Sequence, residues 1–388
     1  MRGIAISPSN QCCSSGSSSP LQFQSQNTLP SQPYRTVNLN PLLQFNKKKK
    51  QNPSNGRRYP IVSKISINPS NNNNNTQTPI RPLVVFGSAN ADIYLEINRL
   101  PKVGETISAN SGQTLAGGKG ANQAACGGRL SYPTYFLGQV GDDAHGKLIS
   151  EALQNGGVCL DYLNTVTDAP TGHAVVMLQP DGQNSIIIVG GANMNCWPHT
   201  LSDQDFEVVR NAGIVLLQRE IPDSVNIQVA KAARSTGVPV ILDAGGMDAP
   251  FPQELLSFID ILSPNESELG RLTGMATESF EQITQAVVKC HKMGVKQVLV
   301  KLGAKGSALF VEGEEPIKQP IISATKVLDT TGAGDTFTAA FAVALVEGKS
   351  RNECLKFAAA AASLCVQVKG AIPSMPDRKS VFDLLQSH

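Results

Sequence analysis

The sequence predicts an α/β fold: a doubly wound α/β/α sandwich with a mostly parallel sheet and a small β-sheet lid. Short β-type runs alternate along the chain with longer helical runs, as in sheets whose parallel strands are joined by helices. Several runs, such as residues 214–217, are apolar without alternation, which is typical of parallel strands covered on both faces. Ligands of such folds bind at the carboxyl ends of the strands.

The expected elements follow this rhythm from residue 83 to the C-terminal region. Strands are expected at residues 83–87, 134–137, 214–217, 239–242, 259–262, 297–302 and 308–311. Helices are expected at residues 119–130, 146–155, 224–235, 266–273, 280–293, 333–347 and 351–368. About 300 residues in this pattern are enough for one large domain with a good core.

Two segments break the rhythm and predict the lid. Residues 93–116 alternate poorly, and residues 172–190 indicate a hairpin whose two strands flank a Pro-Asp-Gly turn at 180–182. We expect both segments to form a separate small sheet over the strand ends, where it would exclude water from a ligand. Two extra edge strands on the main sheet are the alternative.

Residues 1–80 differ in composition from the rest, and we expect them to be a disordered N-terminal transit peptide. They contain no Asp or Glu and nine Lys or Arg, and they are rich in Ser, Asn, Gln and Pro. Such a segment cannot bury enough apolar surface to offset its ordering entropy. An acid-free, Ser-rich N-terminus predicts import into a plastid (chloroplast), with the mitochondrion as the alternative. A nuclear signal in the lysine run at 47–50, or a tail of no consequence, are competing interpretations.

The remaining residues, 81–388, form an acidic domain. Of 33 Lys and Arg, nine lie in the first 80 residues, which leaves 24 against 31 acids. The charge therefore gives no support to nucleic-acid binding. No apolar run approaches the ~18 residues that a membrane span needs, so we expect no membrane partner. The eight cysteines show no CxxC or metal-ligand spacing, which predicts buried thiols in a reduced compartment.

Residues 329–337 carry the most chemical information in the chain. They read Asp-Thr-Thr-Gly-Ala-Gly-Asp-Thr-Phe, between a β-type run at 326–328 and an Ala-rich helical run. Gly332 and Gly334 are expected to allow positive φ and to leave N–H groups open at the positive helix end, where anions bind. A carboxylate repels phosphate, so Asp335 in this position predicts a base for a hydroxyl that attacks the phosphate. The alternative is an N-cap aspartate.

Polar residues near the expected strand ends indicate a site for a polyhydroxyl ligand. Residues 117–122 read Gly-Gly-Lys-Gly-Ala-Asn and open a helix, so the Lys and Asn offer donors, whereas the P-loop spacing is missing. Asn90 and Asp92, two residues apart after the first strand, can point the same way, although a turn cap is the more frequent explanation. Glu220 ends another strand in the corresponding place, where a solvated helix-start acid is the alternative.

Three further segments follow strands or helices. Asn265 and Glu268 share a face on a first helical turn, where they could hold waters of a phosphate-bound Mg²⁺ or simply cap the helix. The glycines of residues 301–306 could let a nucleotide lie along the backbone, although a plain hairpin turn explains them almost as well. Residues 370–374 form a carbonyl-rich loop with one hydroxyl, and their spacing alone predicts no site.

Taken together, these motifs resemble the ribokinases of the PfkB carbohydrate kinase family. The resemblance covers about residues 83–385 and rests on the Gly-Gly-Lys-Gly-Ala-Asn and Asp-Thr-Thr-Gly-Ala-Gly-Asp-Thr-Phe signatures, about 210 residues apart. It implies a ribokinase-like fold and ATP-dependent phosphorylation of D-ribose at its 5-hydroxyl. It also implies Mg²⁺ with ATP, K⁺ as an activating cation and a homodimer formed through the lid strands.

The resemblance further implies roles for individual residues. Asp335 would be the base, and Gly332, Ala333 and Gly334 would form the anion hole. Ribose would contact Asn90, Asp92, Gly118, Lys119, Asn122, Glu220 and Asp335, and ATP would contact Asn265, Lys301, Leu302, Gly303, Ala304, Lys305, Gly306, Gly334 and Asp335. Asn265 and Glu268 would hold Mg²⁺ through water, and K⁺ would lie against Asp329, Thr331, Cys365, Val368, Gly370 and Ser374, several through backbone carbonyls.

The sequence departs from the family pattern in few places and leaves two rivals. Ala359 stands where relatives often carry a His or Asn near the adenine, so that contact would be lost or made by the backbone. One rival is a PfkB kinase for another sugar or a nucleoside. The other is a plastid protein of this kind that has lost catalysis and serves in assembly, although such a protein would be expected to lose the anion-hole glycines or Asp335.

Overall fold

A computed structural model of the protein describes residues 80–180 and 184–387. Residues 1–79 of the expected transit peptide, with its lysine run at 47–50, and the Asp-Gly part of the expected hairpin turn lie outside the described residues. Within these ranges no helix is both long and apolar enough to cross a bilayer.

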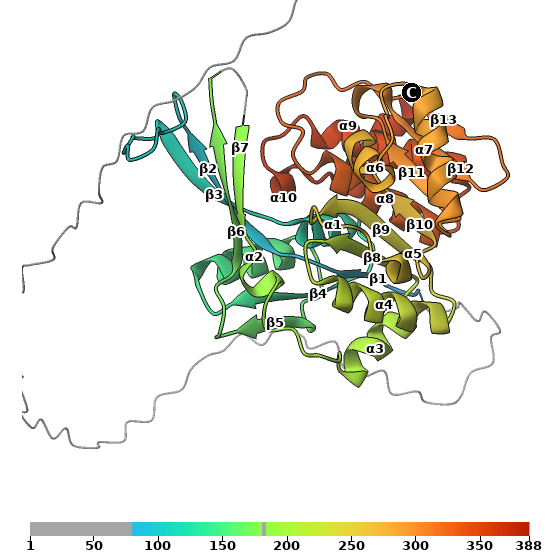
Figure 1. The fold of residues 1–388 in the computed structure, drawn as a ribbon, viewed down its shortest axis with the longest axis horizontal. Coiled ribbons are helices and arrows are strands. Elements are labelled where there is room, and N and C mark those ends of the chain that lie inside the picture. The colour runs from blue at the N-terminus through green and yellow to red at the C-terminus, as the bar shows by residue number, and fades with distance from the viewer. Residues whose placement is uncertain (1–79, 181–183, 388) are drawn as a thin grey trace, which may run out of the picture. The chain divides into compact units, whose positions relative to one another are not determined.

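The described chain forms two sheets, with helices packed on the larger one (Figure 1). The strands are β1 (Leu83–Phe86), β2 (Asn90–Glu96), β3 (Ser111–Gly117), β4 (Thr134–Gly141), β5 (Leu163–Val166), β6 (Gly172–Leu178), β7 (Asn184–Val189), β8 (Ile214–Arg219), β9 (Val240–Gly246), β10 (Ile261–Ser263), β11 (Gln297–Lys301), β12 (Ser307–Val311) and β13 (Ile317–Gln319). The helices are α1 (Lys119–Arg129), α2 (Ala144–Asn155), α3 (Asp203–Arg210), α4 (Asp223–Ser235), α5 (Gln253–Leu256), α6 (Glu266–Thr273), α7 (Phe280–Lys292), α8 (Ala333–Val346), α9 (Arg351–Cys365), α10 (Ala371–Ser374) and α11 (Arg378–Gln386), with short 3₁₀ turns η1 (Gly191–Asn193) and η2 (Gly303–Lys305).

The larger sheet has nine strands in the order β13-β12-β11-β10-β9-β8-β1-β4-β5. The pairs from β5 to β11 are parallel, and only β12 and β13 run antiparallel to their neighbours. β1 lies between β4 and β8, so the chain builds outward from it in both directions. This arrangement creates a switch point at the carboxyl ends of β1 and β8, where open α/β sheets bind ligands.

Helices cover both faces of this sheet and bury its strands. In β1, Leu83 and Val85 join a core formed with α1, α8 and α9, whereas Val84 and Phe86 join a second core formed with α4, α6 and α7. All four side chains are buried, because a parallel strand with helices on both faces has no solvent-facing side. The predicted doubly wound α/β/α sandwich with a mostly parallel sheet is therefore confirmed.

The smaller sheet has the strand order β3-β2-β6-β7 and is separate from the larger one. β2 pairs with β3 and β6 with β7 in antiparallel fashion, while β2 and β6 are parallel. In Figure 1 these strands project from the side of the larger sheet. The predicted small lid sheet is thus present, and the alternative of two extra edge strands on the main sheet is wrong.

Local expectations failed in two ways. The β-type run at 326–328 is not a strand: it has no neighbouring strand, and its Val327 lines the cleft described below. Several elements were missed, among them β5, whose edge position leaves it half-exposed and without a clear apolar pattern. The short helix α3 was also missed, although a Ser202 and Asp205 capping box marks its start.

Candidate active site

A cleft of about 810 Å³ lies beside the start of α8 and the carboxyl ends of β10 and β11. Its lining combines charged groups, glycines and apolar side chains, the usual composition of a site for a polar ligand with an apolar part. The polar, charged and glycine residues include Lys119, Asn265, Glu266, Glu268, Lys301, Gly303, Gly306, Gly332, Gly334 and Asp335, and the apolar ones include Ile321, Ile322, Val327, Phe337, Ala359 and Val366. Ala359 therefore lies at the cleft, as expected from its position in the sequence.

Only one of the two glycines in the turn before α8 has the backbone conformation expected from the sequence. Gly332 is the N-cap residue and is left-handed, with φ of 78°, a conformation that a side chain would strain. Gly334 lies inside the first helical turn without a positive φ, so that part of the expectation is wrong. The Ala333 N–H donates to the Thr330 carbonyl at 3.2 Å. The first turn of α8 thus brings its positive end to the cleft.

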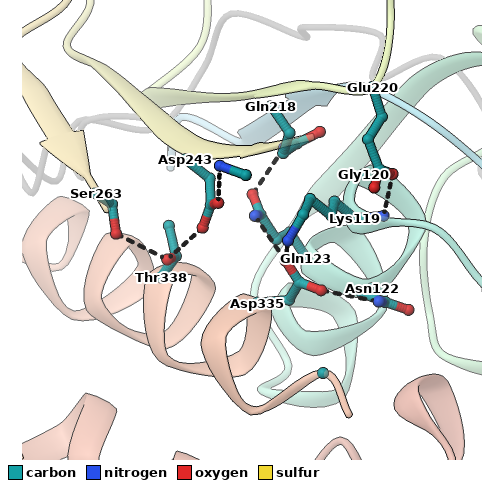
Figure 2. Close-up of polar contacts among 12 residues, drawn as sticks. Lys119, Gly120, Asn122, Gln123, Gln218, Glu220, Asp243, Ser263, Asp335 and Thr338 are labelled. Carbon is teal, nitrogen blue, oxygen red and sulfur yellow. Dashed lines mark hydrogen bonds and ion pairs between the residues drawn. The ribbon is translucent and has the colours of Figure 1, made fainter. Parts of the chain in front are cut away.

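Asp335 is buried in this first turn, with its carboxylate held by side chains of α1 (Figure 2). Asn122 Nδ2 donates to its Oδ2 at 2.9 Å, and Gln123 Nε2 donates to its Oδ1 at 3.2 Å. The Lys119 ammonium lies 4.0 Å from Oδ1. Burial raises the pKa of Asp335, and Lys119 offsets part of this effect. The arrangement orients both carboxylate oxygens and still leaves the group able to take a proton.

The candidate sugar-binding residues converge from three elements. Asn90 and Asp92 lie at the start of lid strand β2, not in a turn, and Glu220 follows β8. Glu220 Oε2 accepts bonds from the Ser88 hydroxyl at 2.6 Å and from the Lys119 N–H at 3.1 Å. Burial, together with the charges of Glu220 and then Asp335, raises the pKa of Asp92 to about 7.

Gly118 shows why this loop needs a glycine. It is the N-cap residue of α1 with φ of 90°, and a Cβ there would lie 2.7 Å from the Asn90 backbone nitrogen. Asn90 itself is fixed, because its Oδ1 accepts a bond from Asn193 Nδ2 at 2.7 Å. The lid strand and the start of α1 are therefore in direct backbone contact.

Asn265 and Glu268 form the capping box that was the alternative explanation. Glu268 N–H donates to Asn265 Oδ1 at 2.8 Å, and Asn265 N–H donates to Glu268 Oε2 at 2.8 Å. Both residues also line the cleft. Both residues bring hard oxygen atoms to this cleft, so the residues present fit a hydrated Mg²⁺. Among the described residues no three His, Cys, Asp or Glu side chains form a metal-binding cluster.

The 301–306 turn forms η2 between β11 and β12. Lys301, Gly303, Ala304 and Gly306 line the cleft. The Leu302 side chain is instead buried in the core, and Lys305 pairs with Glu266 at 3.2 Å.

The residues matched to the K⁺ site lie in one loop cluster. Asp329 accepts bonds from the Thr331 N–H at 2.9 Å and from the Gly370 N–H at 2.8 Å. The Cys365 thiol lies 3.0 Å from the Ser374 hydroxyl and 3.9 Å from the Thr331 carbonyl. Val368 is half-exposed, and its N–H donates to the Cys365 carbonyl at 3.2 Å. Carbonyl and hydroxyl oxygens thus meet next to the turn that leads into α8, a donor set that fits K⁺.

Comparison with known proteins decides the family. Residues 81–378 match the pfkB family of carbohydrate kinases. The chain belongs to this family. A ribokinase of Arabidopsis thaliana is 69% identical over 369 residues, covering 91% of this chain and 97% of that protein. A ribokinase of Bacillus subtilis is 37% identical over 306 residues, covering 79% of this chain and 100% of the relative.

Solved PfkB-type structures support the same assignment. The structure of Arabidopsis thaliana ribokinase complexed with ribose and ATP matches with a TM-score of 0.77 and 77% identity, covering 79% of this chain and 99% of that one. The ribokinase of Thermotoga maritima matches with a TM-score of 0.70 and 35% identity, covering 79% and 99% of the two chains. The expected ribokinase-like fold is thereby confirmed.

The structure of this PfkB protein adds buried polar residues that the sequence did not single out. Gln218 Nε2 donates to Gln123 Oε1 at 2.7 Å, which turns the Gln123 amide towards Asp335. Asn193 binds both the Ala89 backbone and Asn90. These residues carry no local signature, because their role depends on partners 95 to 212 positions away.

Asp243 was also missed, and it has a detectable signal. It lies within β9 directly after the apolar run at 239–242, as Glu220 follows another such run. Asp243 Oδ2 lies 2.6 Å from the Lys301 ammonium and accepts a bond from the Thr338 hydroxyl at 3.1 Å. Although burial opposes it, the attraction of Lys301 and then Lys119 holds the pKa of Asp243 below its usual range.

Proposed function

We propose that this chain transfers the γ-phosphoryl group of ATP to the 5-hydroxyl of D-ribose, giving D-ribose 5-phosphate and ADP. One observation carries the proposal: Asp335 lies where the cleft meets the polar groups below the lid, at the positive end of α8. Its carboxylate is within electrostatic reach of Asp92 on β2, so the cleft and the candidate sugar site share this group. The similarity to ribokinases and to a ribokinase bound to ribose and ATP supports this choice of substrates.

The catalytic step follows from the position of Asp335. A sugar hydroxyl is a poor nucleophile, and the transferred phosphoryl group spreads negative charge over its oxygens in the transition state. Asp335 orients the hydroxyl and accepts its proton late in the transfer, while Lys119 and Asn122 keep the carboxylate in place. Backbone N–H groups around Gly332, Ala333 and Gly334 stabilise the phosphoryl oxygens as an anion hole. The Ala333 N–H is bonded to the Thr330 carbonyl in this structure and would have to turn away from it to take part.

Substrate binding uses both sheets. Asn90 and Asp92 approach ribose from the lid, and Gly118, Lys119, Asn122 and Glu220 approach it from the larger sheet and α1. ATP lies in the cleft along the 301–306 turn, with the adenine among apolar side chains that include Ile322 and Val327. Asn265 and Glu268 would hold Mg²⁺ through water, and the ion would neutralise phosphate charge.

A substrate panel tests the proposal directly. ATP consumption is measured with D-ribose, fructose and adenosine, and we expect turnover with ribose to exceed that with the others by at least about tenfold. Preference for fructose or adenosine would assign the chain to another branch of the PfkB family. No turnover with any acceptor would support the non-catalytic assembly role, against which the presence of Gly332, Gly334 and Asp335 speaks.

K⁺ activation is the second part of the proposal. The cation would bind the loop cluster of Asp329, Thr331, Cys365, Val368, Gly370 and Ser374 and stabilise the turn into α8 without touching the substrates. Removal of K⁺ is therefore expected to lower kcat several-fold. Equal activity in K⁺-free buffer balanced with tetramethylammonium and in K⁺ buffer would refute this role.

An exposed apolar edge of the lid sheet supports the proposal that the chain forms a homodimer. β7 is an edge strand of the small sheet, and Ile186, Ile187, Ile188 and Val189 are exposed on it. A long apolar edge strand is a template for pairing with another chain. We infer that two copies pair through the lid strands, and sedimentation of the protein with Ile187→Lys should show a shift towards the monomer.

Residues 1–80 are proposed to act as a plastid transit peptide, with the mitochondrion as the alternative. Their composition supports this, and so does the match to the Arabidopsis thaliana protein, which covers 91% of this chain against 79% for the bacterial relative. A fusion of residues 1–80 to a fluorescent protein should enter plastids. Cytosolic or nuclear fluorescence would contradict the proposal.

A further inference from the structure

The side chain of Lys301 occupies an unusual place for a lysine. It lies at the end of β11, lines the cleft and is only 13% exposed. A Cβ placed on Gly334 would lie 3.8 Å from its Nζ, so the ammonium group is next to the first turn of α8. A positive side chain therefore lies beside the N–H groups that form the proposed anion hole.

Asp243 fixes the position of this ammonium group. Its Oδ2 lies 2.6 Å from Lys301 Nζ, while its Oδ1 accepts a bond from the Gly245 N–H at 3.0 Å. The Thr338 hydroxyl binds the same Oδ2 and lies 3.1 Å from the Ser263 hydroxyl, so β9, β10 and α8 all hold this carboxylate (Figure 2). Because Asp243 is fully buried, it cannot swing away with the lysine.

The negative charge at this end of the cleft is too large for Lys119 alone to balance once a nucleotide binds. Asp335, Glu268 and Asp243 are carboxylates at or beside it, and Lys119 is attracted by all three. A nucleotide triphosphate adds several more negative charges. Both lysines that line the cleft are paired, Lys119 with Asp335 at 4.0 Å and Lys301 with Asp243 at 2.6 Å, but it is Lys301 whose ammonium group lies beside Gly334.

We propose that the Lys301 ammonium group binds the phosphate chain of the nucleotide, and that Asp243 is a positioning residue that aims it at the start of α8. The inference deepens the proposed function and rests on it. The family resemblance places ATP along the 301–306 turn, but it assigns neither the charge of this side chain nor any role for Asp243. A lysine ammonium bound to phosphate is a charge-assisted contact of the stronger kind.

The competing explanation is a purely structural ion pair that neutralises a buried carboxylate. The two explanations predict different changes in affinity for nucleotides with one phosphate and for nucleotides with more. If the pair is only structural, its loss should change the affinities for AMP and for ADP by the same factor. A phosphate-binding lysine affects ADP and leaves AMP nearly unchanged, because AMP lacks the outer phosphates.

Calorimetry on the full chain with the Lys301→Met substitution separates them. We expect the affinity for Mg-ADP to fall by about 10- to 100-fold, the usual loss for a hydrogen bond to a charged group, and that for AMP by less than about threefold. Lys231→Met is the matched control, since it removes an ion pair of the same 2.6 Å length with Glu254, on the surface of α4. The control should bind both nucleotides like the unsubstituted chain.

A double variant guards against misfolding, because Lys301→Met alone leaves Asp243 buried without its partner. In Lys301→Met with Asp243→Asn both charges are gone, and thermal stability should return towards that of the unsubstituted chain. Mg-ADP affinity should nevertheless stay low. If the double variant recovered both stability and Mg-ADP affinity, the pair would be structural and the proposal would be overturned.

The kinetics show whether Asp243 acts through Lys301. Asp243→Asn should lower kcat about tenfold in the unsubstituted chain and have no further effect on the Lys301→Met background. Additive effects would contradict the positioning role. The calorimetric outcomes do not depend on the sugar: failure of ribose turnover in the unsubstituted chain would reject the proposed function, whereas equal losses for AMP and Mg-ADP would reject only the lysine contact.

Discussion

Asp335 at the start of α8 and Asp243 in β9 are both buried and both attract Lys119, yet their pKa values shift in opposite directions. Burial raises the pKa of Asp335, and Lys119 at 4.0 Å offsets it only in part. Burial also opposes ionisation of Asp243, but Lys301 at 2.6 Å overcomes this and lowers the pKa.

The difference shows that burial alone does not decide what a carboxylate does. The contact ion pair with Lys301 and two further hydrogen-bond donors, the Gly245 N–H and the Thr338 hydroxyl, keep Asp243 ionised and fixed. Asp335 has amide donors and a more distant ammonium group. No cation in direct contact therefore prevents it from taking up a proton during catalysis. We therefore assign proton transfer to Asp335 and positioning to Asp243.

The sharpest test of this comparison is Asp335→Asn. The variant cannot accept the proton, so we expect kcat to fall by roughly 10²–10⁴-fold, the usual general-base range. Ribose binding, measured by calorimetry, should be retained. Near-normal turnover would remove Asp335 from its role.

Asp243→Asn, unlike Asp335→Asn, should act mainly on the stability of the fold. It leaves the buried Lys301 without its partner, so we expect a loss of about 3 kcal/mol in the free energy of unfolding, measured in urea. Asp260→Asn is the control, since it breaks a more exposed pair with Arg234 and should cost less than about 1 kcal/mol. Equal losses in the two variants would show that the buried pair is not special.

Asp92 extends the comparison to a carboxylate whose pKa is raised, from 3.8 to about 7, by burial and by neighbouring acids. Between these pH values the folded protein keeps a proton that the unfolded chain has released, so stability falls as pH rises through this window. Asp92→Asn does not titrate there. Its Tm relative to the unsubstituted chain should therefore increase from pH 4 to 7 by several degrees and then stay constant, whereas a pH-independent difference would count against the raised pKa.

The smallest effect is expected for Thr338→Val, which removes the hydroxyl between Asp243 and Ser263 and keeps the side-chain shape. Unfolding in urea should become easier by about 1 kcal/mol, the typical value of one hydrogen bond. Thr284→Val is a suitable control, because its hydroxyl only binds the Phe280 carbonyl within α7. A loss no larger than in the control would show that the network does not support Asp243.

Much of the fold was predictable because local signals agreed with one another. The apolar runs of β1 and β8, the Gly-rich start of α1 and the turn before α8 each have a sequence pattern with a direct structural meaning. The run at 326–328 was misread because apolar residues that line a cleft look like a buried strand. Gly334 was misread because a glycine can also adopt the ordinary helical backbone that it has in the first turn of α8.

The candidate site was predictable where a motif carries its own chemistry. The Gly-Ala-Gly-Asp turn and the Gly-Gly-Lys-Gly-Ala-Asn loop are of this kind, and the structure brings Asp335, Lys119 and Asn122 together. The opposite holds for Gln123 and Asn193, whose neighbours in the chain give no hint of a function. The capping box of Asn265 and Glu268 shows a third case, since the same two residues satisfy both interpretations.

The amino-acid order alone determined the α/β class, the separate small sheet and the position of Asp335 at a helix start, because periodicity, turn glycines and helix starts act over a few residues. Tertiary structure alone decided which buried carboxylate pairs with which lysine. That choice depends on distances of a few ångströms between residues as far apart as Asp243 and Lys301, and only the packed sheet sets those distances.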